Sequence, residues 1–327
     1  STDLHIHTVF SDGEVWPSIR VKEARREGLD LIAMTEHLEY QPHSEDIPHP
    51  DRNRSFHVAS SQLAEGDVLQ VINGSEITRE MPPGHINAVF IKDANMLLHS
   101  DSLTGIQEAN KQGAFVFWNH PNWDAQRGDG IARLEPFHEY LIANKLLHGI
   151  EVVNETTYSE EALQLALDNN LTILGTSDIH GLTDWAHKLG AGGHRPMTFV
   201  KVTQRTPEAV KEALFQRKTV VWYDDLIIGN EGTNNAFNSS LNHPVQIHFD
   251  DFDQNGSVDP ILSYYIQGKS YPLATRDEIL GQWVALKSTY PSYESYAKTD
   301  LESLLKDHIT ENTNIWKATA IRSMQIE

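Results

Sequence analysis

The chain of 327 residues contains no cysteine, few basic residues and no long apolar run. Without cysteine it has neither disulfides nor thiolate metal ligands, so any metal site must use nitrogen and oxygen donors. No stretch approaches the roughly 18 apolar residues that a membrane helix needs, and we expect no membrane span. Lys and Arg number 26 against 46 Asp and Glu, which gives a net charge of −20. This charge repels polyanions, so long nucleic acid is not an expected partner.

Short apolar runs alternate with helical patterns along most of the chain, which is typical of parallel strands joined by crossover helices. The expected strands are 4–7, 31–34, 68–72, 86–91, 114–118, 149–153, 171–175, 198–202 and 219–223. The expected helices are 17–28, 102–112, 159–169 and 206–217. The sequence therefore predicts an α/β fold with a TIM-like barrel over residues 1–225.

The pattern changes after about Asp225, where Asn, Ser and Thr become frequent and two alternating segments follow at 244–249 and 262–267. We expect residues 226–327 to form a small β-rich, sandwich-like domain. Within it, Asp251, Asp253 and Asn255 resemble the start of a calcium loop, but Leu262 stands where such a loop prefers a bidentate Glu. An Asn-Gly hairpin turn is the preferred interpretation of this stretch.

Potential metal ligands gather at the ends of the predicted strands. His5 and His7 are two residues apart on the first strand, so their side chains are expected on one face. Others follow later strands: Asp12, His37, Glu76, His120, Asp178 and His180. The C-terminal strand ends of such a barrel meet at one mouth, where active sites lie. His85 precedes its strand, so a loop would have to bring it in. Ordinary loop residues could supply two or three of these positions, but not the whole ordered series.

The ordered motifs DLHIHTVFSDG, MTEH, GSEIT, GHINAVF, WNHP and TSDIHG resemble those of the PHP (polymerase and histidinol phosphatase) superfamily of metal-dependent phosphoesterases. The resemblance runs from Asp3 to about Tyr223 and implies a distorted (β/α)7 barrel with three adjacent metal positions. It implies a first metal at His5, His7, Glu76 and Asp178, a second at Glu76, His85 and His120, and a third at Asp12, His37 and His180. Glu36 stands where the family often has Asp, beside a ligand that is retained.

Six imidazoles and three carboxylates suit Zn, Fe or Mn better than Mg or Ca, so we expect two to three divalent transition-metal ions. These ions would attract phosphate and supply metal-bound hydroxide for in-line attack on phosphorus. Asp178 and His180 are the candidates for proton transfer. Arg79 and Arg195 are candidates for phosphate binding. For each of them, an exposed side chain without a partner is an equally good interpretation.

A strongly acidic protein with a local cationic pocket favours a small phosphate ester as substrate. The motifs and the β-rich tail are similar to those of bacterial two-domain phosphodiesterases for small organophosphate diesters, so we expect hydrolysis of a small phosphodiester. The alternatives are a phosphomonoesterase of the histidinol-phosphatase type, an exonuclease on short oligonucleotides, and a non-catalytic metal-binding protein. A complete ligand set at an open mouth favours an enzyme, because purely structural sites are closed by protein ligands.

Three tryptophans flank the motifs. Trp118 is expected in the core, whereas Trp123 and Trp185 could line an apolar pocket for an ester group. The chain begins at Ser1 rather than Met, which fits removal of an export signal or a shortened chain, and together with the subgroup resemblance this favours an exported or periplasmic protein over a cytoplasmic one. The sequence indicates no oligomeric state.

Overall fold

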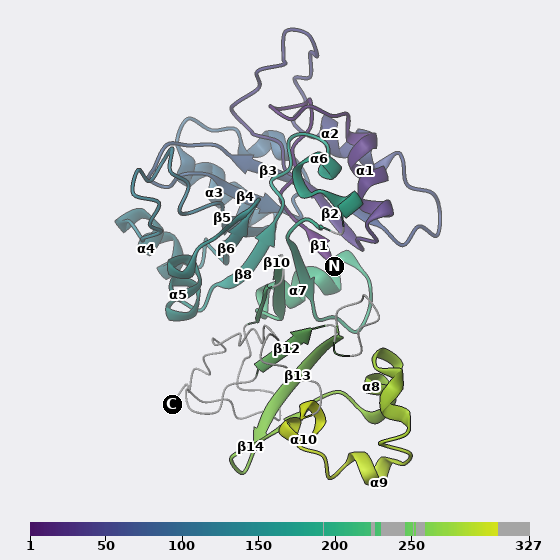
Figure 1. Ribbon diagram of the computed structural model, residues 1–327. Coiled ribbons are helices and arrows are strands. Elements are labelled where there is room, and N and C mark those ends of the chain that lie inside the picture. The colour runs from purple at the N-terminus through teal and green to yellow at the C-terminus, as the bar shows by residue number, and fades with distance from the viewer. Residues whose placement is uncertain (192, 224–225, 230–245, 251, 253–258, 307–327) are drawn as a thin grey trace. The chain divides into compact units, whose positions relative to one another are not determined.

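The computed structural model describes residues 1–327 except 192, 224–225, 230–245, 251, 253–258 and 307–327 (Figure 1). The chain divides into two compact units, Ser1–Ile227 and Ile228–Glu327. Among the described residues, no helix combines the length and the apolar character required to cross a bilayer.

Strands and helices alternate along the first unit. Its strands are β1 (Thr2–Asp3), β2 (Leu31–Met34), β3 (Gln70–Ile77), β4 (Ile86–Val89), β5 (Phe115–Trp118), β6 (Gly149–Asn154), β7 (Thr157–Tyr158), β8 (Thr172–Thr176), β9 (Met197–Val200) and β10 (Thr219–Tyr223), and β11 (Leu226–Gly229) crosses the unit boundary. Its helices are α1 (Pro17–Arg26), α2 (Arg54–Ser60), η1 (Ala94–Leu97), α3 (Ser102–Lys111), α4 (Pro136–Ala143), α5 (Glu160–Asp168), α6 (Thr183–His187), η2 (Leu189–Ala191) and α7 (Pro207–Phe215).

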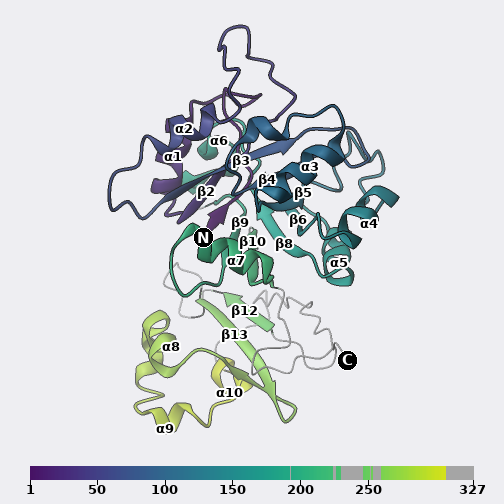
Figure 2. The same cartoon turned by 180° about the vertical axis from the view of Figure 1, so that it is seen from behind.

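Strands β1 to β6 and β8 form a closed ring. The order is β1-β2-β3-β4-β5-β6 with β8 beside β6, and β4 runs antiparallel to both of its neighbours. The ring closes beyond the strand ends, where the Asp178 N–H donates to the His5 carbonyl at 2.9 Å and the His7 N–H donates to the Ile179 carbonyl at 3.1 Å. Figures 1 and 2 show α1 and α2 outside one side of the ring and α4 and α5 outside the other. This arrangement confirms the predicted distorted TIM-like barrel.

Alternation along the strands separates the barrel interior from the layer under the helices. On β2, Leu31 and Ala33 belong to a buried cluster that includes Leu214 of α7, whereas Ile32 and Met34 pack in a second cluster with α1 residues. Burial of each such aliphatic side chain contributes about 1.5–3 kcal/mol. The interior below the mouth is therefore a packed apolar core that supports the polar residues above it.

The first strand differs from its prediction. Strand β1 ends at Asp3, and beyond it only Ile6 forms an isolated bridge, with Ile179. Leu4 and Ile6 pack in different clusters, so the segment 4–7 is not a regular strand with one apolar face. His5 and His7 nevertheless converge. The segment 4–7 is held between Thr35, which follows β2, and Ile179, which follows β8. Helices α2, α4 and α6 had no counterpart in the sequence interpretation.

The second unit contains helices as well as strands. Strands β12 (Gln246–Asp250), β13 (Asp259–Ile266) and β14 (Lys269–Pro272) form an antiparallel sheet, followed by α8 (Arg276–Gln282), η3 (Val284–Lys287), α9 (Tyr293–Tyr296) and α10 (Leu301–Leu305). Its core includes Ile261, Trp283 and Leu304. Over the residues described, this unit has one sheet rather than the two of a sandwich. Residues Asp251, Asp253 and Asn255, which resemble the start of a calcium loop, lie outside the described residues, and so does the Asn-Gly turn preferred for this stretch.

Candidate active site

The first group of donors is almost completely buried at the barrel mouth. His5 Nε2 and His7 Nε2 lie 3.0 Å apart, and each lies 3.1 Å from Glu76 Oε2. Asp178 Oδ1 is 3.1 Å from His5 Nε2 and 3.0 Å from His7 Nε2. The side chains of His5, His7 and Glu76 have no exposed area. Four donor atoms therefore converge in the combination that the sequence predicts for the first metal.

Glu76 also reaches the second group through its other oxygen. Glu76 Oε1 lies 2.6 Å from His85 Nδ1 and 3.7 Å from His120 Nε2. His85 joins this group because β4 is antiparallel, so the residue before β4 lies at the same end of the barrel as the C-terminal end of β3. His85, which precedes its strand in the sequence, thus reaches the barrel mouth because β4 runs antiparallel to β3.

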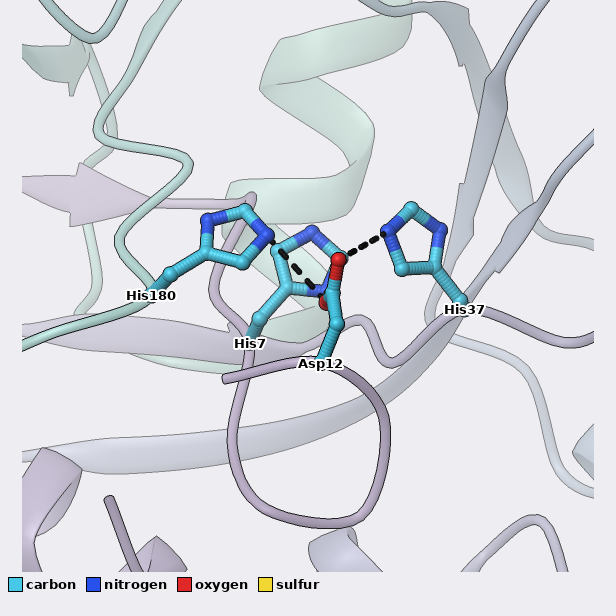
Figure 3. Close-up of side chains that lie close together, drawn as sticks. All are labelled: His7, Asp12, His37 and His180. Carbon is cyan, nitrogen blue, oxygen red and sulfur yellow. Dashed lines mark ion pairs between the residues drawn. The ribbon is translucent and has the colours of Figure 1, made fainter. Parts of the chain in front are cut away.

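The third group centres on Asp12, which follows the segment after β1 (Figure 3). Asp12 Oδ2 lies 3.3 Å from His37 Nε2, and Asp12 Oδ1 lies 3.2 Å from His180 Nε2. His7 Nδ1 is 3.7 Å from Asp12 Oδ1. His37 connects this group to the others, since its Nδ1 lies 3.2 Å from Glu76 Oε2. All nine predicted ligands are therefore gathered in one place.

Several of these donor atoms lie within ion-pair distance of another ligand and yet form no hydrogen bond of good geometry. Among the described residues, the buried ligand atoms without a hydrogen bond are Asp12 Oδ1, Glu76 Oε1, His85 Nδ1, His120 Nδ1 and Asp178 Oδ1. Buried polar atoms are normally satisfied, so such a concentration indicates that an external group completes the site. Six imidazoles and three carboxylates fit divalent transition-metal ions, and compatible donor groups include His5, His7 and Glu76.

The close packing of histidines and carboxylates also shifts their pKa values. Burial alone lowers the pKa of His7, but hydrogen bonds and attraction from Asp178 and Glu76 outweigh it and raise the pKa to about 10. Burial raises the pKa of Asp178, whereas His5 and His7 hold it well below its usual range. The protein alone therefore attracts positive charge to the place where metal ions would lie.

Glu151 on β6 holds the ligands from behind, and the sequence analysis did not identify it. Its Oε1 lies 2.8 Å from His5 Nδ1 and accepts a hydrogen bond from the Thr176 hydroxyl at 2.7 Å. Its Oε2 accepts from the His120 N–H at 2.7 Å and from the Asn154 amide at 2.9 Å. The sequence signal for Glu151 was its charge within the apolar run GIEVV. A carboxylate buried in a strand requires polar partners, which indicates a structural or functional role.

Two other buried charged residues fix the loops that carry ligands. The Glu36 carboxylate accepts hydrogen bonds from the Thr8 N–H and from the hydroxyls of Ser11 and Ser55. The fully buried Arg20 guanidinium donates to the carbonyls of His7, Ile179, His180 and Gly181. Arg20 thereby connects His7, in the segment after β1, to residues 179–181, in the segment after β8.

The donors open into a pocket of about 550 Å³. Its lining consists of Asp12, His37, His85, His120, Asn122, Trp123, Asp124, Gly130, Asn154, Glu155, Thr157, Asp178 and His180. Trp123 is the only one of the three predicted tryptophans in this lining: Trp118 is buried and stacks on His138, and Trp185 is 75% exposed elsewhere.

The two arginines expected to bind phosphate lie outside this pocket. Arg195 is fully buried, where its guanidinium donates to Asp3, Glu27 and Thr183, so it braces the fold instead of facing the mouth. Arg79 pairs with Glu39 at 2.7 Å and donates to the His99 carbonyl. Both corrections have one reason: neighbouring carboxylates already engage these guanidinium groups.

A distorted barrel with nine imidazole and carboxylate donors at its mouth defines a metal-dependent enzyme. Its fold and sequence are similar to those of a two-domain protein from Bacteroides vulgatus described as a predicted PHP-like metal-dependent phosphoesterase. The two share 38% identity over 82% of this chain and 86% of the other, with a TM-score of 0.69. The chain therefore belongs to the PHP-like metal-dependent phosphoesterases.

More distant structures also match. One is a putative metal-dependent phosphoesterase from Bifidobacterium adolescentis (18% identity, 55% of this chain, 87% of the other, TM-score 0.40). Another is a lesion-specific endonuclease from Pyrococcus furiosus (17% identity, 66% of this chain, 55% of the other, TM-score 0.43). No family model matches the sequence, and no curated protein is detectably similar.

Proposed function

We propose that this phosphoesterase hydrolyses small phosphate diesters, with three divalent transition-metal ions at the three donor groups. The observation that carries the diester preference is the lining of the pocket, which holds no lysine or arginine among the described residues. A diester carries one negative charge and a monoester close to two at neutral pH, so a monoester needs more cationic partners. A pocket without basic side chains therefore suits the diester.

Charge counting agrees with this preference. Three carboxylates among the nine ligands would leave three divalent ions with a surplus of about three positive charges. Two further carboxylates, Asp124 and Glu155, line the same pocket and reduce the surplus. A singly charged phosphodiester and a hydroxide nucleophile would then leave the site with a net charge close to zero.

Bound divalent ions would supply Lewis-acid chemistry, neutralising phosphoryl oxygens and lowering the pKa of water. The protein's own residues would orient the substrate and move protons. His180 lines the pocket with its side chain 32% exposed, and in this proposal it transfers a proton to the leaving alcohol only while its Nε2 is not bound to a metal ion. Asn154 donates to Asp178 Oδ2 at 3.2 Å, which fixes the orientation of that carboxylate.

The test combines elemental analysis of the purified protein with assays on bis(p-nitrophenyl) phosphate and p-nitrophenyl phosphate. We expect two to three Zn, Fe or Mn ions per chain and faster turnover of the diester. Faster turnover of the monoester would instead favour the phosphomonoesterase alternative. Failure to retain any of these metals, even after reconstitution, would contradict the proposed site. A metal-loaded protein inactive on every ester would favour a non-catalytic metal-binding role.

A further inference from the structure

We propose that the part of the pocket formed by Trp123, Asp124 and Glu155 binds an alcohol arm of the diester that carries a positively charged amine. This inference rests on the proposed phosphodiesterase function and specifies the substrate class. The three residues come from two separate loops, one after β5 and one between β6 and β7, and all three line the pocket that holds the ligands. None of them is a predicted ligand.

Trp123 provides an aromatic surface next to the second donor group. Its ring centroid lies 5.1 Å from that of His120 and 5.5 Å from that of His85. The Trp123 N–H donates to the His120 carbonyl at 2.9 Å, so the turn that carries the ring is tied to a ligand. The side chain remains 43% exposed. A substrate whose phosphorus lies among the donors would therefore place one arm against this ring.

Asp124 and Glu155 supply negative charge to the same pocket. Within the described part of the chain, neither carboxylate forms an ion pair or accepts a side-chain hydrogen bond, although both are exposed to the pocket. Glu155 adopts a left-handed backbone conformation (φ 51°), and its N–H donates to the Thr176 carbonyl at 3.2 Å. This backbone contact fixes the Glu155 loop to β8, so the barrel positions the main chain from which the carboxylate extends.

An ammonium group is the chemistry that matches a pocket lined by an aromatic face and two carboxylates. Cations bind over aromatic rings, most strongly over tryptophan, and carboxylates attract the same charge. An anionic arm would meet two like charges and no basic lining residue, while a neutral polyol would gain hydrogen bonds but no charge attraction. The arrangement therefore selects amino-alcohol esters over these two classes.

The kinetic test compares glycerophosphocholine with glycerophosphoglycerol, diesters of similar size whose second alcohol is cationic or neutral. We expect the metal-loaded wild-type protein to give a kcat/KM roughly tenfold higher for the cationic substrate, chiefly because the two carboxylates attract its ammonium group. The double variant Asp124→Asn/Glu155→Gln should lose most of that preference. Glu65→Gln, an exposed carboxylate outside the pocket, is the matched control and should retain it.

A binding measurement separates this inference from the proposed function. Choline is titrated calorimetrically into the metal-loaded wild-type protein and into the double variant, with binding expected to be roughly tenfold weaker in the variant because it lacks both carboxylates. Choline binding without turnover of any diester would reject the phosphodiesterase function and support the cation site. Diester turnover without choline binding, or with equal or better use of glycerophosphoglycerol, would overturn the inference and leave the function standing.

Discussion

His5 Nδ1 lies 2.8 Å from Glu151 Oε1, so a buried carboxylate determines which nitrogen of a ligand histidine carries the proton. With Nδ1 donating to Glu151, the Nε2 lone pair points to Glu76 and Asp178. The same carboxylate binds the backbone N–H of His120. One residue that does not itself face the donor groups therefore orients ligands of both the first and the second group.

Glu151→Gln should weaken metal binding about 10- to 100-fold, the usual effect of losing an outer partner of a ligand histidine. The glutamine carbonyl can still accept from His5, but its amide nitrogen cannot accept from the His120 N–H. Competition with a chelator measures this change. Glu65→Gln serves as the control, and unchanged affinity in Glu151→Gln would show that the contact has no influence on the site.

Asp12→Ala should remove about one metal ion per chain, whereas Glu76→Gln should remove more than one. Asp12 contacts only the third group and His7, while Glu76 lies within 3.2 Å of His5, His7 and His37 and reaches His85 with its other oxygen. Elemental analysis of the two variants against wild-type protein gives the counts. Equal metal loss in both variants would contradict three separate positions.

Arg195→Met should destabilise the protein by about 3–5 kcal/mol, because it leaves the buried Asp3 and the largely buried Glu27 without their cation. Chemical denaturation measures the loss. The control is Arg205→Met, whose side chain is 73% exposed beside Asp30 and should contribute at most about 1 kcal/mol. A stable Arg195→Met protein with weakened substrate binding would restore the phosphate-binding role predicted from sequence.

The ligand set was predictable because every ligand except His85 lies in or after an apolar run, and because the ordered motifs resemble those of the PHP superfamily. The position of His85 was not, since local sequence does not reveal that β4 runs antiparallel to β3 and β5. The same limit applies to Arg195. Its proximity to the Asp178 motif in sequence gave no indication that it faces Asp3, which is 192 residues away along the chain.

Partners behind the ligands were missed for a different reason. Glu151 lies inside a strand predicted from its apolar run, and Arg20 lies inside a helix predicted from Pro17 at its start and Gly28 at its end, so neither charge was considered. Once buried, a charged side chain needs several polar partners. Glu151 and Arg20 both have them, and these partners include ligand residues. Charged positions inside apolar elements therefore deserve examination as supports for a predicted site.

His138 makes the stability of the metal-free protein depend on pH. It stacks on Trp118 with ring centroids 4.0 Å apart, accepts the Glu135 N–H at its Nδ1 and lies 2.7 Å from the Pro83 carbonyl through Nε2. Burial lowers its pKa to about 4, although the Pro83 contact opposes this shift. The folded protein therefore holds this imidazole neutral.

Because the folded pKa lies below the unfolded value of 6.5, the unfolded chain binds this proton first as the pH falls. The contribution of His138 to stability is thus complete above pH 6.5 and declines by about 1.4 kcal/mol per pH unit until about pH 4. Between pH 6.5 and 5, wild-type protein should lose about 2 kcal/mol more than His138→Gln, which has no titrating imidazole. Urea denaturation of both metal-free proteins at several pH values measures the difference, and subtraction cancels the other histidines. Parallel curves would mean that His138 titrates normally in the folded state, and its burial against Trp118 would then carry no pH dependence.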